Sequence, residues 1–258
     1  MDVPTVDVLS VNISVIDQDR AREILFDAIR SGRRGYVTVT GVHGVMEAQR
    51  DPELLRILNA ALLATPDGIP MVWMGRLQNE PSIRRVYGPD LMLNICEHGR
   101  AENFTHFLYG GAPDVAEDLS AKLQKRFPGL NVVGTFTPPF RPLDADEKSD
   151  LQRCIRETRP DFFWVGLSTP KQEKFMSEFL PQLPETRIML GVGAAFDLLT
   201  GRVKQAPLWM QQSGLEWFYR WTQEPERLTA RYLVNIPAFI LMAAAQLTKH
   251  VLQRGEGK

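Results

Sequence analysis

Short apolar runs rich in β-forming residues alternate along this chain with longer amphipathic stretches, and this alternation constrains the fold more than any other feature. The clearest runs are YVTVTGV at 36–42, FTHFLY at 104–109, DFFWVGL at 161–167 and RIMLGV at 187–192. Helical patterns lie between them, which is the rhythm of repeated βα units. The run at 161–167 is almost entirely apolar, as expected of a strand covered on both faces. The sequence therefore predicts an α/β fold with a mostly parallel sheet and helices on both faces.

The remaining elements can be placed around these runs. We expect an extended segment at 6–16, strands at 62–65 and 131–136, and helices near 19–29, 45–62, 69–77, 89–100 and 113–127. Asp144 and Glu147 form a capping box that opens a helix running to Arg159. Thr169 and Gln172 form a second, T-x-x-Q capping box, which predicts another helix start.

The pattern changes after Gly201, where no β-rich run remains and aromatic residues and arginines dominate. We therefore expect two parts, an α/β domain at 1–201 and a helical appendage at 202–258. From Arg202 to the end, eight Lys and Arg stand against four Asp and Glu, although the whole chain has a net charge of −1. A basic tail on a mildly acidic body indicates an anionic partner for the tail.

Composition and spacing argue against several classes of protein. The net charge of −1 is unlike that of a nucleic-acid-binding protein. The two cysteines and four histidines lack metal-ligand spacing, so we expect no metal site. We see no signal peptide at the N-terminus. The apolar stretch at 232–247 is shorter than the roughly 18 residues of a membrane span, and Asn235, Pro237 and Gln246 interrupt it, so we place the chain in the cytoplasm.

Asp67 is the sharpest single candidate for chemistry. It follows the strand at 62–65, lies between Pro66 and Gly68, and precedes an apolar helical stretch. Ligands of open α/β sheets bind beyond the carboxyl ends of the strands. A carboxylate in that position can take a proton from an incoming hydroxyl as a general base. The alternative is that Asp67 only caps the helix that follows.

Two glycine-rich turns are candidate sites for a diphosphate. The backbone amides of Gly110 and Gly111 could hold a phosphate at the start of the helix that follows them. From Gly191 through Gly193 to Asp197, small residues lead from a strand into a helix and would let a ligand approach the backbone. Each turn has a structural alternative, because tight turns and close helix–sheet packing need small residues without any ligand. Neither turn matches GxGxxG, and the chain has no Walker A motif.

Two cationic residues also suggest a phosphate. Lys171 falls at a helix start, where the helix dipole disfavours a cation unless an anion is present. This favours a nucleotide contact at Lys171, Gln172 and Glu173. Arg85 could clamp a phosphate with two parallel hydrogen bonds, although a single surface arginine is more often only solvated.

Aromatic and basic residues are interleaved in the tail. Aromatic side chains with a polar tip next to arginines suit a bilayer interface, and arginines can bind the diphosphate of a lipid-linked molecule. The arginines concerned are Arg220, Arg227 and Arg231. The alternative is a helical subdomain that packs on the core, or on another copy of the chain in a homo-oligomer.

Taken together, these stretches resemble the WecG/TagA/CpsF family, glycosyltransferase family 26. The resemblance rests on AQRDPELLRILNAA, TPDGIPMVW, RVYGPDLM, FLYGGAPDVAEDLSAKL, PGLNVVGTF, STPKQEKF, GVGAAFDLLTGRVKQAPLWMQ, GLEWFYR and EPERLTARYL, which follow the family's order and cover most of 38–233. It implies a Rossmann-like core and an appendage that helps to reach the membrane and close the site. It also implies an inverting enzyme that needs neither metal nor cofactor. Such an enzyme moves a sugar from a UDP-sugar to an undecaprenyl-diphosphate-linked sugar, in cell-surface polysaccharide synthesis.

The resemblance further implies roles for individual residues. Asp67 takes the general-base position, and Arg85 and Gln172 fall on pocket positions of the family pattern; we predict that Thr40 also belongs to the catalytic site. The residues that we predict to bind the UDP-sugar are Thr38, Gly110, Gly111, Lys171, Gln172, Glu173, Gly191, Gly193 and Asp197. Arg220, Arg227 and Arg231 match appendage arginines that engage a diphosphate. We expect the protein to bind peripherally to the inner face of the cell membrane.

The chain departs from the family pattern at 39–43, where it reads VTGVH and many members carry a T-P-N-P-E-type stretch. The threonine of the active site is therefore either Thr38 or Thr40. The donor sugar stays open between N-acetylmannosamine, its uronic acid and glucose, and the acceptor glycan and the oligomeric state stay open too.

Two other functions were weighed against a glycosyltransferase. An NAD-dependent oxidoreductase is disfavoured by the missing GxGxxG and by the missing acidic residue about 20 positions later. A non-enzymatic membrane scaffold would leave Asp67 and Lys171 without a task.

Overall fold

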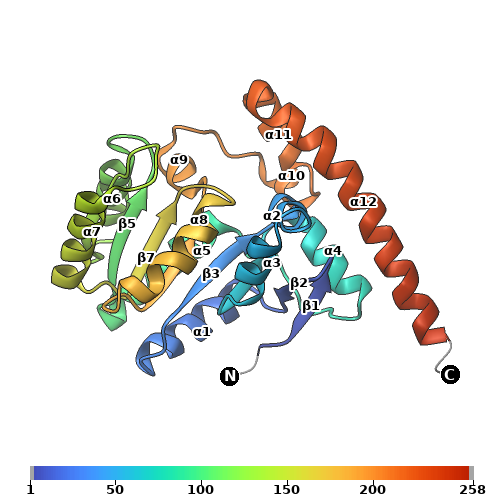
Figure 1. Ribbon diagram of the computed structural model, residues 1–258, viewed down its shortest axis with the longest axis horizontal. Coiled ribbons are helices and arrows are strands. Elements are labelled where there is room, and N and C mark those ends of the chain that lie inside the picture. Colours follow the sequence, from blue (N-terminus) through green and yellow to red (C-terminus); the bar gives the residue numbers. More distant parts are fainter. Residues whose placement is uncertain (1–2, 256–258) are drawn as a thin grey trace.

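A six-stranded parallel sheet forms the centre of the molecule in the computed structural model, which describes residues 3–255 (Figure 1). Its strands lie in the order β4-β3-β8-β7-β5-β6, and all neighbouring pairs are parallel. They are β3 (Gly35–Thr40), β4 (Leu63–Pro66), β5 (Thr105–Gly110), β6 (Asn131–Phe136), β7 (Phe162–Gly166) and β8 (Ile188–Gly191). Short 3₁₀ helices, η1 (Arg100–Glu102) and η2 (Leu180–Gln182), precede β5 and β8. The predicted α/β fold class is confirmed.

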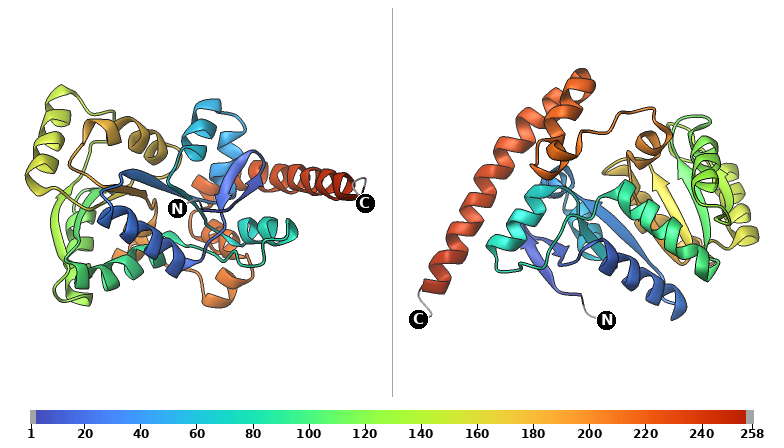
Figure 2. Two further views of the ribbon diagram at one scale, coloured as in Figure 1. Left: turned by 90° about the horizontal axis from the view of Figure 1, so that it is seen from below. Right: turned by 180° about the vertical axis from the view of Figure 1, so that it is seen from behind.

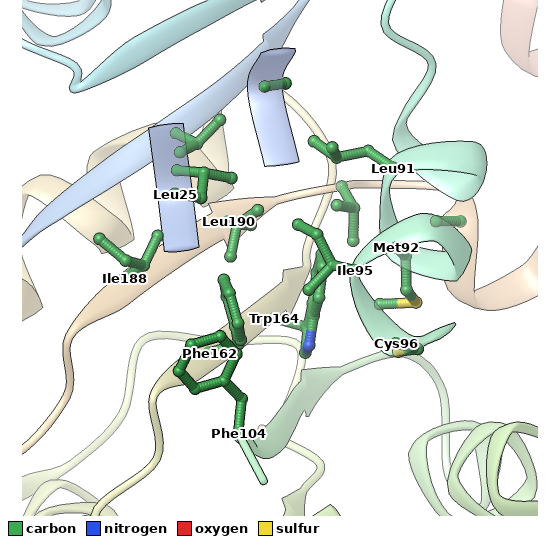
Figure 3. Close-up of a cluster of buried hydrophobic side chains, with 14 of the residues drawn as sticks. Leu25, Leu91, Met92, Ile95, Cys96, Phe104, Phe162, Trp164, Ile188 and Leu190 are labelled. Carbon is green, nitrogen blue, oxygen red and sulfur yellow. The ribbon is translucent and has the colours of Figure 1, made fainter. Parts of the chain in front are cut away.

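Helices cover both faces of the sheet because its strands are apolar on both sides. In β7, Phe162 and Trp164 belong to one core, whereas Phe163 and Val165 belong to the other. The first face is covered by α1 (Gln18–Arg30), α5 (Gly88–Gly99), α6 (Val115–Arg126) and α9 (Ala195–Thr200). The second is covered by α3 (Pro52–Asn59), α7 (Ala145–Thr158) and α8 (Lys171–Phe179). Figure 3 shows the first core, in which side chains of α1 and α5 surround Phe162 and Trp164.

An antiparallel hairpin of β1 (Thr5–Val8) and β2 (Val11–Ser14) forms a separate two-stranded sheet. Its apolar side chains pack with α2 (Val42–Ala48) and α4 (Ile69–Leu77) in a third core. Phe239 and Ala243 of the last helix, α12 (Pro225–Gly255), are buried in the same core. The tail is therefore packed on the body of the molecule along part of its length.

Two of the predicted elements need correction. The helix expected at 45–62 is two helices, α2 and α3, because Asp51 starts a new one. Its side chain accepts hydrogen bonds from the amides of Glu53 and Leu54 and so caps α3. The segment expected to be extended at 6–16 folds back into the hairpin, since Leu9 and Ser10 adopt positive φ angles of 51° and 70° at the turn.

The two predicted capping boxes have opposite outcomes. The box of Asp144 and Glu147 is confirmed, since the side chain of each accepts from the backbone amide of the other. The box at Thr169 is wrong, because α8 has Pro170 as its N-cap residue and no side-chain capping bond. The Thr169 hydroxyl donates instead to the carboxylate of Glu173, with an Oγ1–Oε1 distance of 2.8 Å. The amide of Gln172, which the box would have capped, donates to the carbonyl oxygen of Ser168 at 3.0 Å.

Helices make up the regular structure after Gly201 in the part of the chain that the structure describes. They are α10 (Leu208–Gln212), α11 (Glu216–Gln223) and α12. Asn235, Pro237 and Gln246 do not end the helix, because α12 runs through all three. By length and composition alone, Pro225–His250 is long and apolar enough to cross a bilayer, with a mean hydropathy of 1.5 in its most apolar window. Figure 2 shows α12 projecting beyond the rest of the molecule.

Candidate active site

A cleft of about 430 Å³ opens between the carboxyl ends of β3 and β4 and the tail helices α11 and α12. Its walls come from the β3–α2 turn, the β4–α4 turn, the segment before α5, and residues of α11 and α12. In Figure 1, α10 and α11 lie next to α2, at the end towards which β3 points. The α/β core and the tail therefore build this cleft together.

Asp67 lies in the wall of the cleft, directly after β4. Its amide donates to the carbonyl of Thr40 at 3.0 Å, which ties the turn to β3. Gly68, with φ of 91°, is the N-cap residue of α4, and no side chain caps that helix. The interpretation of Asp67 as a helix cap is therefore wrong. Its Oδ1 atom is buried and has no hydrogen-bond partner among the described residues. This oxygen is therefore available to bind a ligand or a proton.

The surroundings of Asp67 raise its pKa to about 6. Burial by the neighbouring atoms is the largest cause, although 30% of the side-chain surface remains exposed. Glu216 and Asp90 raise the pKa further, whereas Arg85 and Arg220 lower it. A carboxylate that ionises near pH 6 is suited to proton transfer near neutral pH.

Arg85 connects Asp67 to the tail. Its Nη2 atom lies 3.9 Å from Asp67 Oδ1 and donates to the carboxylate of Glu216 on α11. Its guanidinium carbon lies 4.1 Å from the centre of the Tyr87 ring, a cation–π contact. Since the side chain is only 15% exposed, the interpretation of Arg85 as a merely solvated surface arginine is wrong.

The structure separates the three tail arginines. Arg220 and Arg231 line the cleft, and the Nε atom of Arg220 is buried without a partner among the described residues. Arg227 is exposed and pairs with Glu224 of the tail, and the walls of the cleft do not include it. Two of the three arginines therefore lie where they can reach an anion bound near Asp67.

One side of the cleft is apolar. Trp73 of α4 and Ile240 of α12 line it and are 51% and 59% exposed, and Phe239, which is buried in the core around the hairpin, lines it as well. The surface of α12 beyond the cleft is apolar as well, because no charged residue occurs from 232 to 248. Charged groups next to an apolar wall suit an amphiphilic ligand.

A second hollow, of about 590 Å³, opens at the carboxyl ends of β5 and β7. It brings together three of the predicted UDP-sugar residues, Gly111, Lys171 and Asp197. Lys148 and Lys174 also line it, which makes it cationic. The hollow lies on the same edge of the sheet as Asp67, but β8 separates the strands that carry the two sites.

Packing requires one of the predicted phosphate-binding glycines. A Cβ atom on Gly110, where φ is 122°, would come within 2.7 Å of the carbonyl oxygen of Gly166. That backbone cannot move aside, so close packing explains Gly110 without a ligand. A Cβ atom on Gly191 would come within 2.7 Å of the terminal methyl group of Met176, a flexible side chain that can shift.

Gln172, Glu173 and Gly193 form a cluster at the end of β8, between the cleft and the second hollow. The Gly193 amide donates to Gln172 Oε1 at 2.9 Å, and Gln172 Nε2 donates to Glu173 Oε1 at 3.0 Å. Glu173 is buried, which raises its pKa, and its Oε2 atom has no partner among the described residues. Because they bond one another, these residues hold the loop after β8 in place.

Thr38 and Thr40 are both buried in β3. The Thr40 hydroxyl donates to the Thr38 hydroxyl at 3.0 Å. The cleft walls include neither threonine, but they do include Gly41 and His43 of the turn that follows. The threonine pair therefore lies inside β3, directly before the turn that lines the cleft.

Sequence reasoning missed several residues of the cleft. Tyr87 and Trp73 have no local signal, because only the fold brings them beside Arg85 and α12. Glu216 did have a signal, as an acidic residue in a basic tail. His43 follows β3, and burial is the main cause that lowers its pKa to about 4, so its ring is neutral at pH 7.

Comparison with known proteins identifies relatives over most of the chain. The model of the glycosyl transferase WecG/TagA/CpsF family matches residues 6–253. An N-acetylglucosaminyldiphosphoundecaprenol N-acetyl-beta-D-mannosaminyltransferase of Bacillus subtilis (strain 168) is 29% identical over 194 residues, which are 75% of this chain and 73% of that protein. The protein of the same name from Bacillus spizizenii (strain ATCC 23059 / NRRL B-14472 / W23) is 28% identical over 194 residues, 75% of this chain and 72% of its own.

Proposed function

This chain belongs to the WecG/TagA/CpsF family of glycosyl transferases, and from that membership we propose that it moves a sugar from a UDP-sugar onto a sugar linked to a polyprenyl diphosphate. The names of the two Bacillus relatives support this acceptor class. They also make N-acetylmannosamine the first donor sugar to test, ahead of its uronic acid and glucose. The product would serve cell-surface polysaccharide synthesis.

The observation that carries the proposal is the uncommitted carboxylate of Asp67 between a core arginine and a tail arginine. Asp67 takes the proton of the acceptor hydroxyl, whose oxygen attacks the anomeric carbon of the donor. The bond from that carbon to the diphosphate breaks, and UDP leaves with the bonding electrons. A single displacement of this kind inverts the anomeric configuration. Arg85, next to Asp67, is placed to stabilise the negative charge that develops on the departing diphosphate of UDP.

For the donor, we propose that the nucleotide binds in the cationic hollow beside Gly111, Lys171 and Asp197. Lysine side chains there neutralise phosphate charge. Gly110, Gly191, Gly193, Gln172 and Glu173 shape the loops around this hollow. Thr38 or Thr40, buried in β3, holds in place the turn at Gly41, and this turn contacts the sugar in the cleft.

For the acceptor, we propose that its diphosphate lies near Arg220 and Arg231 and its lipid chain lies along the apolar side of the cleft. The exposed apolar face of α12 then rests in the inner face of the cell membrane, with the 1–201 domain on the cytoplasmic side. Apolar side chains such as Trp73 and Ile240 favour shallow insertion of this kind. The 202–258 segment is accordingly a membrane-binding appendage that completes the site.

We expect transfer to proceed in EDTA at the rate measured with magnesium or manganese. Arginine and lysine side chains supply the positive charge that a metal ion supplies to the leaving diphosphate in other enzymes. Among residues 3–255, no three His, Cys, Asp or Glu side chains are grouped as a metal site requires. The rate of UDP release should be compared with EDTA alone and after adding each metal. Activity that vanishes in EDTA and returns with metal would contradict the metal-independent mechanism.

Calorimetric titration with UDP and with NAD tests the nucleotide assignment directly. We expect saturable binding of UDP and none of NAD, with UDP binding weakened by replacing Lys171 with Ala. Lys125→Ala is the matched control and should leave UDP binding unchanged, because Lys125 is an exposed lysine in the last turn of α6 and does not line the hollow. Binding of NAD in place of UDP would favour an oxidoreductase, and binding of neither would favour a scaffold.

A further inference from the structure

The tail places an acidic residue inside a cleft that is otherwise suited to anions. Glu216 is the first residue of α11, and only 16% of its side chain is exposed. A carboxylate at this position repels a diphosphate and so weakens its binding. Anion binding therefore does not explain why a glutamate stands at position 216. Its contact with Arg85 is the feature that can explain it.

Those contacts place Arg85 between two carboxylates. The same nitrogen, Nη2, donates to Glu216 and lies 3.9 Å from Asp67 Oδ1. A hydrogen-bonded arginine–carboxylate pair has a nitrogen–oxygen distance of about 2.7–2.9 Å. Arg85 is therefore near Asp67 without being bonded to it, and Glu216 holds it on the other side. The Tyr87 ring below the guanidinium further fixes its plane.

We propose that Glu216 is a positioning residue for the transfer: by holding Arg85, it keeps the Asp67 carboxylate free to take the proton of the acceptor hydroxyl. This inference rests on the proposed function, in which Asp67 is the general base. Without Glu216, Arg85 moves about 1 Å and forms a close ion pair with Asp67. That pair occupies the oxygen that would otherwise accept the proton.

The charges around Asp67 give this role a measurable signature. The titratable and charged groups that face Asp67 or share its cleft are Arg85, Asp90, Glu216, Arg220, Arg231, His43, Tyr87 and Tyr232. Glu216 and Asp90 raise the pKa of Asp67, and Arg85 and Arg220 lower it. When the charge of Glu216 is removed, only Asp90 still counteracts the lowering of the Asp67 pKa by Arg85 and Arg220. The pKa of Asp67 then falls, and the carboxylate becomes a weaker base.

The test is the pH dependence of kcat/KM for wild type, Glu216→Gln and Glu216→Asp, measured by UDP release with lipid-linked acceptor. In the wild type we expect activity to fall as the pH drops below about 6, because Asp67 becomes protonated. In Glu216→Gln we expect this acidic limb to move to lower pH and kcat at pH 8 to fall at least about 10-fold. In Glu216→Asp, which keeps the carboxylate, the position of the acidic limb and kcat at pH 8 should both lie between those of Glu216→Gln and the wild type. Glu226→Gln, an exposed acid at the start of α12, should match the wild type.

Each outcome decides the inference. If Glu216→Gln loses activity but its acidic limb does not move, Glu216 is only a structural residue and the inference is overturned. The inference is also overturned if neither the rate nor the acidic limb changes. If Glu216→Gln does not fold, an unmoved limb in Glu216→Asp is the overturning result. A wild-type profile without an acidic limb, together with normal turnover by Asp67→Asn, would instead remove the general base itself. The two failures are therefore distinguishable.

Discussion

Replacing Asp67 with Asn is expected to lower kcat by about 100-fold or more while leaving the affinity for UDP nearly unchanged. The amide keeps the size of the side chain but cannot take the proton of the acceptor hydroxyl, and general-base contributions are typically of this size. In the proposed function UDP binds in the separate hollow at β5 and β7, so its affinity should persist. UDP release at saturating acceptor gives kcat, and calorimetry gives the affinity for UDP.

The matched control is Asp90→Asn, which removes a negative charge near Asp67 from an exposed position at the start of α5. It should retain most of the wild-type rate. Near-normal turnover by a folded Asp67→Asn protein would rule out Asp67 as the general base.

Loss of the fold does not explain the expected loss of activity, because Asp67 opposes folding at neutral pH. Its folded pKa of about 6 lies above the ordinary aspartate value of 3.8, so the folded state binds the proton more tightly than the unfolded state. Stability is therefore lost as the pH rises from about 4 to about 6, by roughly 3 kcal/mol for a two-unit shift. The melting temperature of Asp67→Asn at pH 8 should accordingly not fall below that of the wild type.

Replacing Arg220 and Arg231 together with Ala is expected to reduce transfer to the lipid-linked acceptor by about 100-fold or more. Each charge-assisted hydrogen bond to a diphosphate contributes about 1.5–3 kcal/mol, and both arginines line the cleft. Binding to anionic liposomes should weaken much less, because each basic residue adds only about 1 kcal/mol there. The apolar face of α12 adds a part that salt does not remove. Co-sedimentation with liposomes at two salt concentrations separates these contributions.

Arg227→Ala is the control for this experiment, since Arg227 is exposed and pairs with Glu224 away from the cleft. It should lower transfer much less than the double change. Equal losses in the single and the double variant would contradict the assignment of Arg220 and Arg231 to the diphosphate. Adding Arg227→Ala to the double variant should change little further.

Deleting the whole tail is a poorer experiment, because the structure gives α12 a second task. Phe239 and Ala243 complete the core around the hairpin. Gln246 accepts a hydrogen bond from the Leu9 amide at 3.0 Å, and the Asn235 side chain accepts one from Arg50. Removing 203–258 would expose this core, so loss of activity would not separate folding from catalysis. Membrane binding is better tested by changing exposed positions, such as Leu233 and Leu241, to Asn.

The sequence predicts the sheet well because its strands are buried on both faces. A strand such as FFWVG in β7 must be apolar at every position, and this makes it visible without knowledge of its neighbours. Local capping is equally visible at Asp144 and Glu147. At Thr169 the same local rule fails, because the Gln172 amide donates to the Ser168 carbonyl oxygen and not to the Thr169 hydroxyl.

The candidate site was predictable where one turn carries its own signal, as at Asp67, or where the family resemblance supplies one, as at Arg85, Arg220 and Arg231. Asp67 and its neighbouring glycine lie in a single strand exit, and the sequence pattern identifies them. The pairing of Arg85 with Glu216 joins positions 131 residues apart, and no local pattern encodes it. The same holds for the exposure of Arg227, which depends on how α11 and α12 pack and not on the spacing of arginines. The length of α12 was not predictable from the apolar stretch alone, because the helix begins at Pro225 and runs through Pro237.

The most direct test of the central claim is an assay in EDTA that combines the protein with a polyprenyl-diphosphate-linked sugar and each of a panel of UDP-sugars. UDP release and the mass of the lipid product are measured together. The account predicts that one donor class releases UDP only when acceptor is present, and that the lipid product gains the mass of one sugar. If no donor gives acceptor-dependent release of UDP, with or without added metal, the proposed transfer is contradicted.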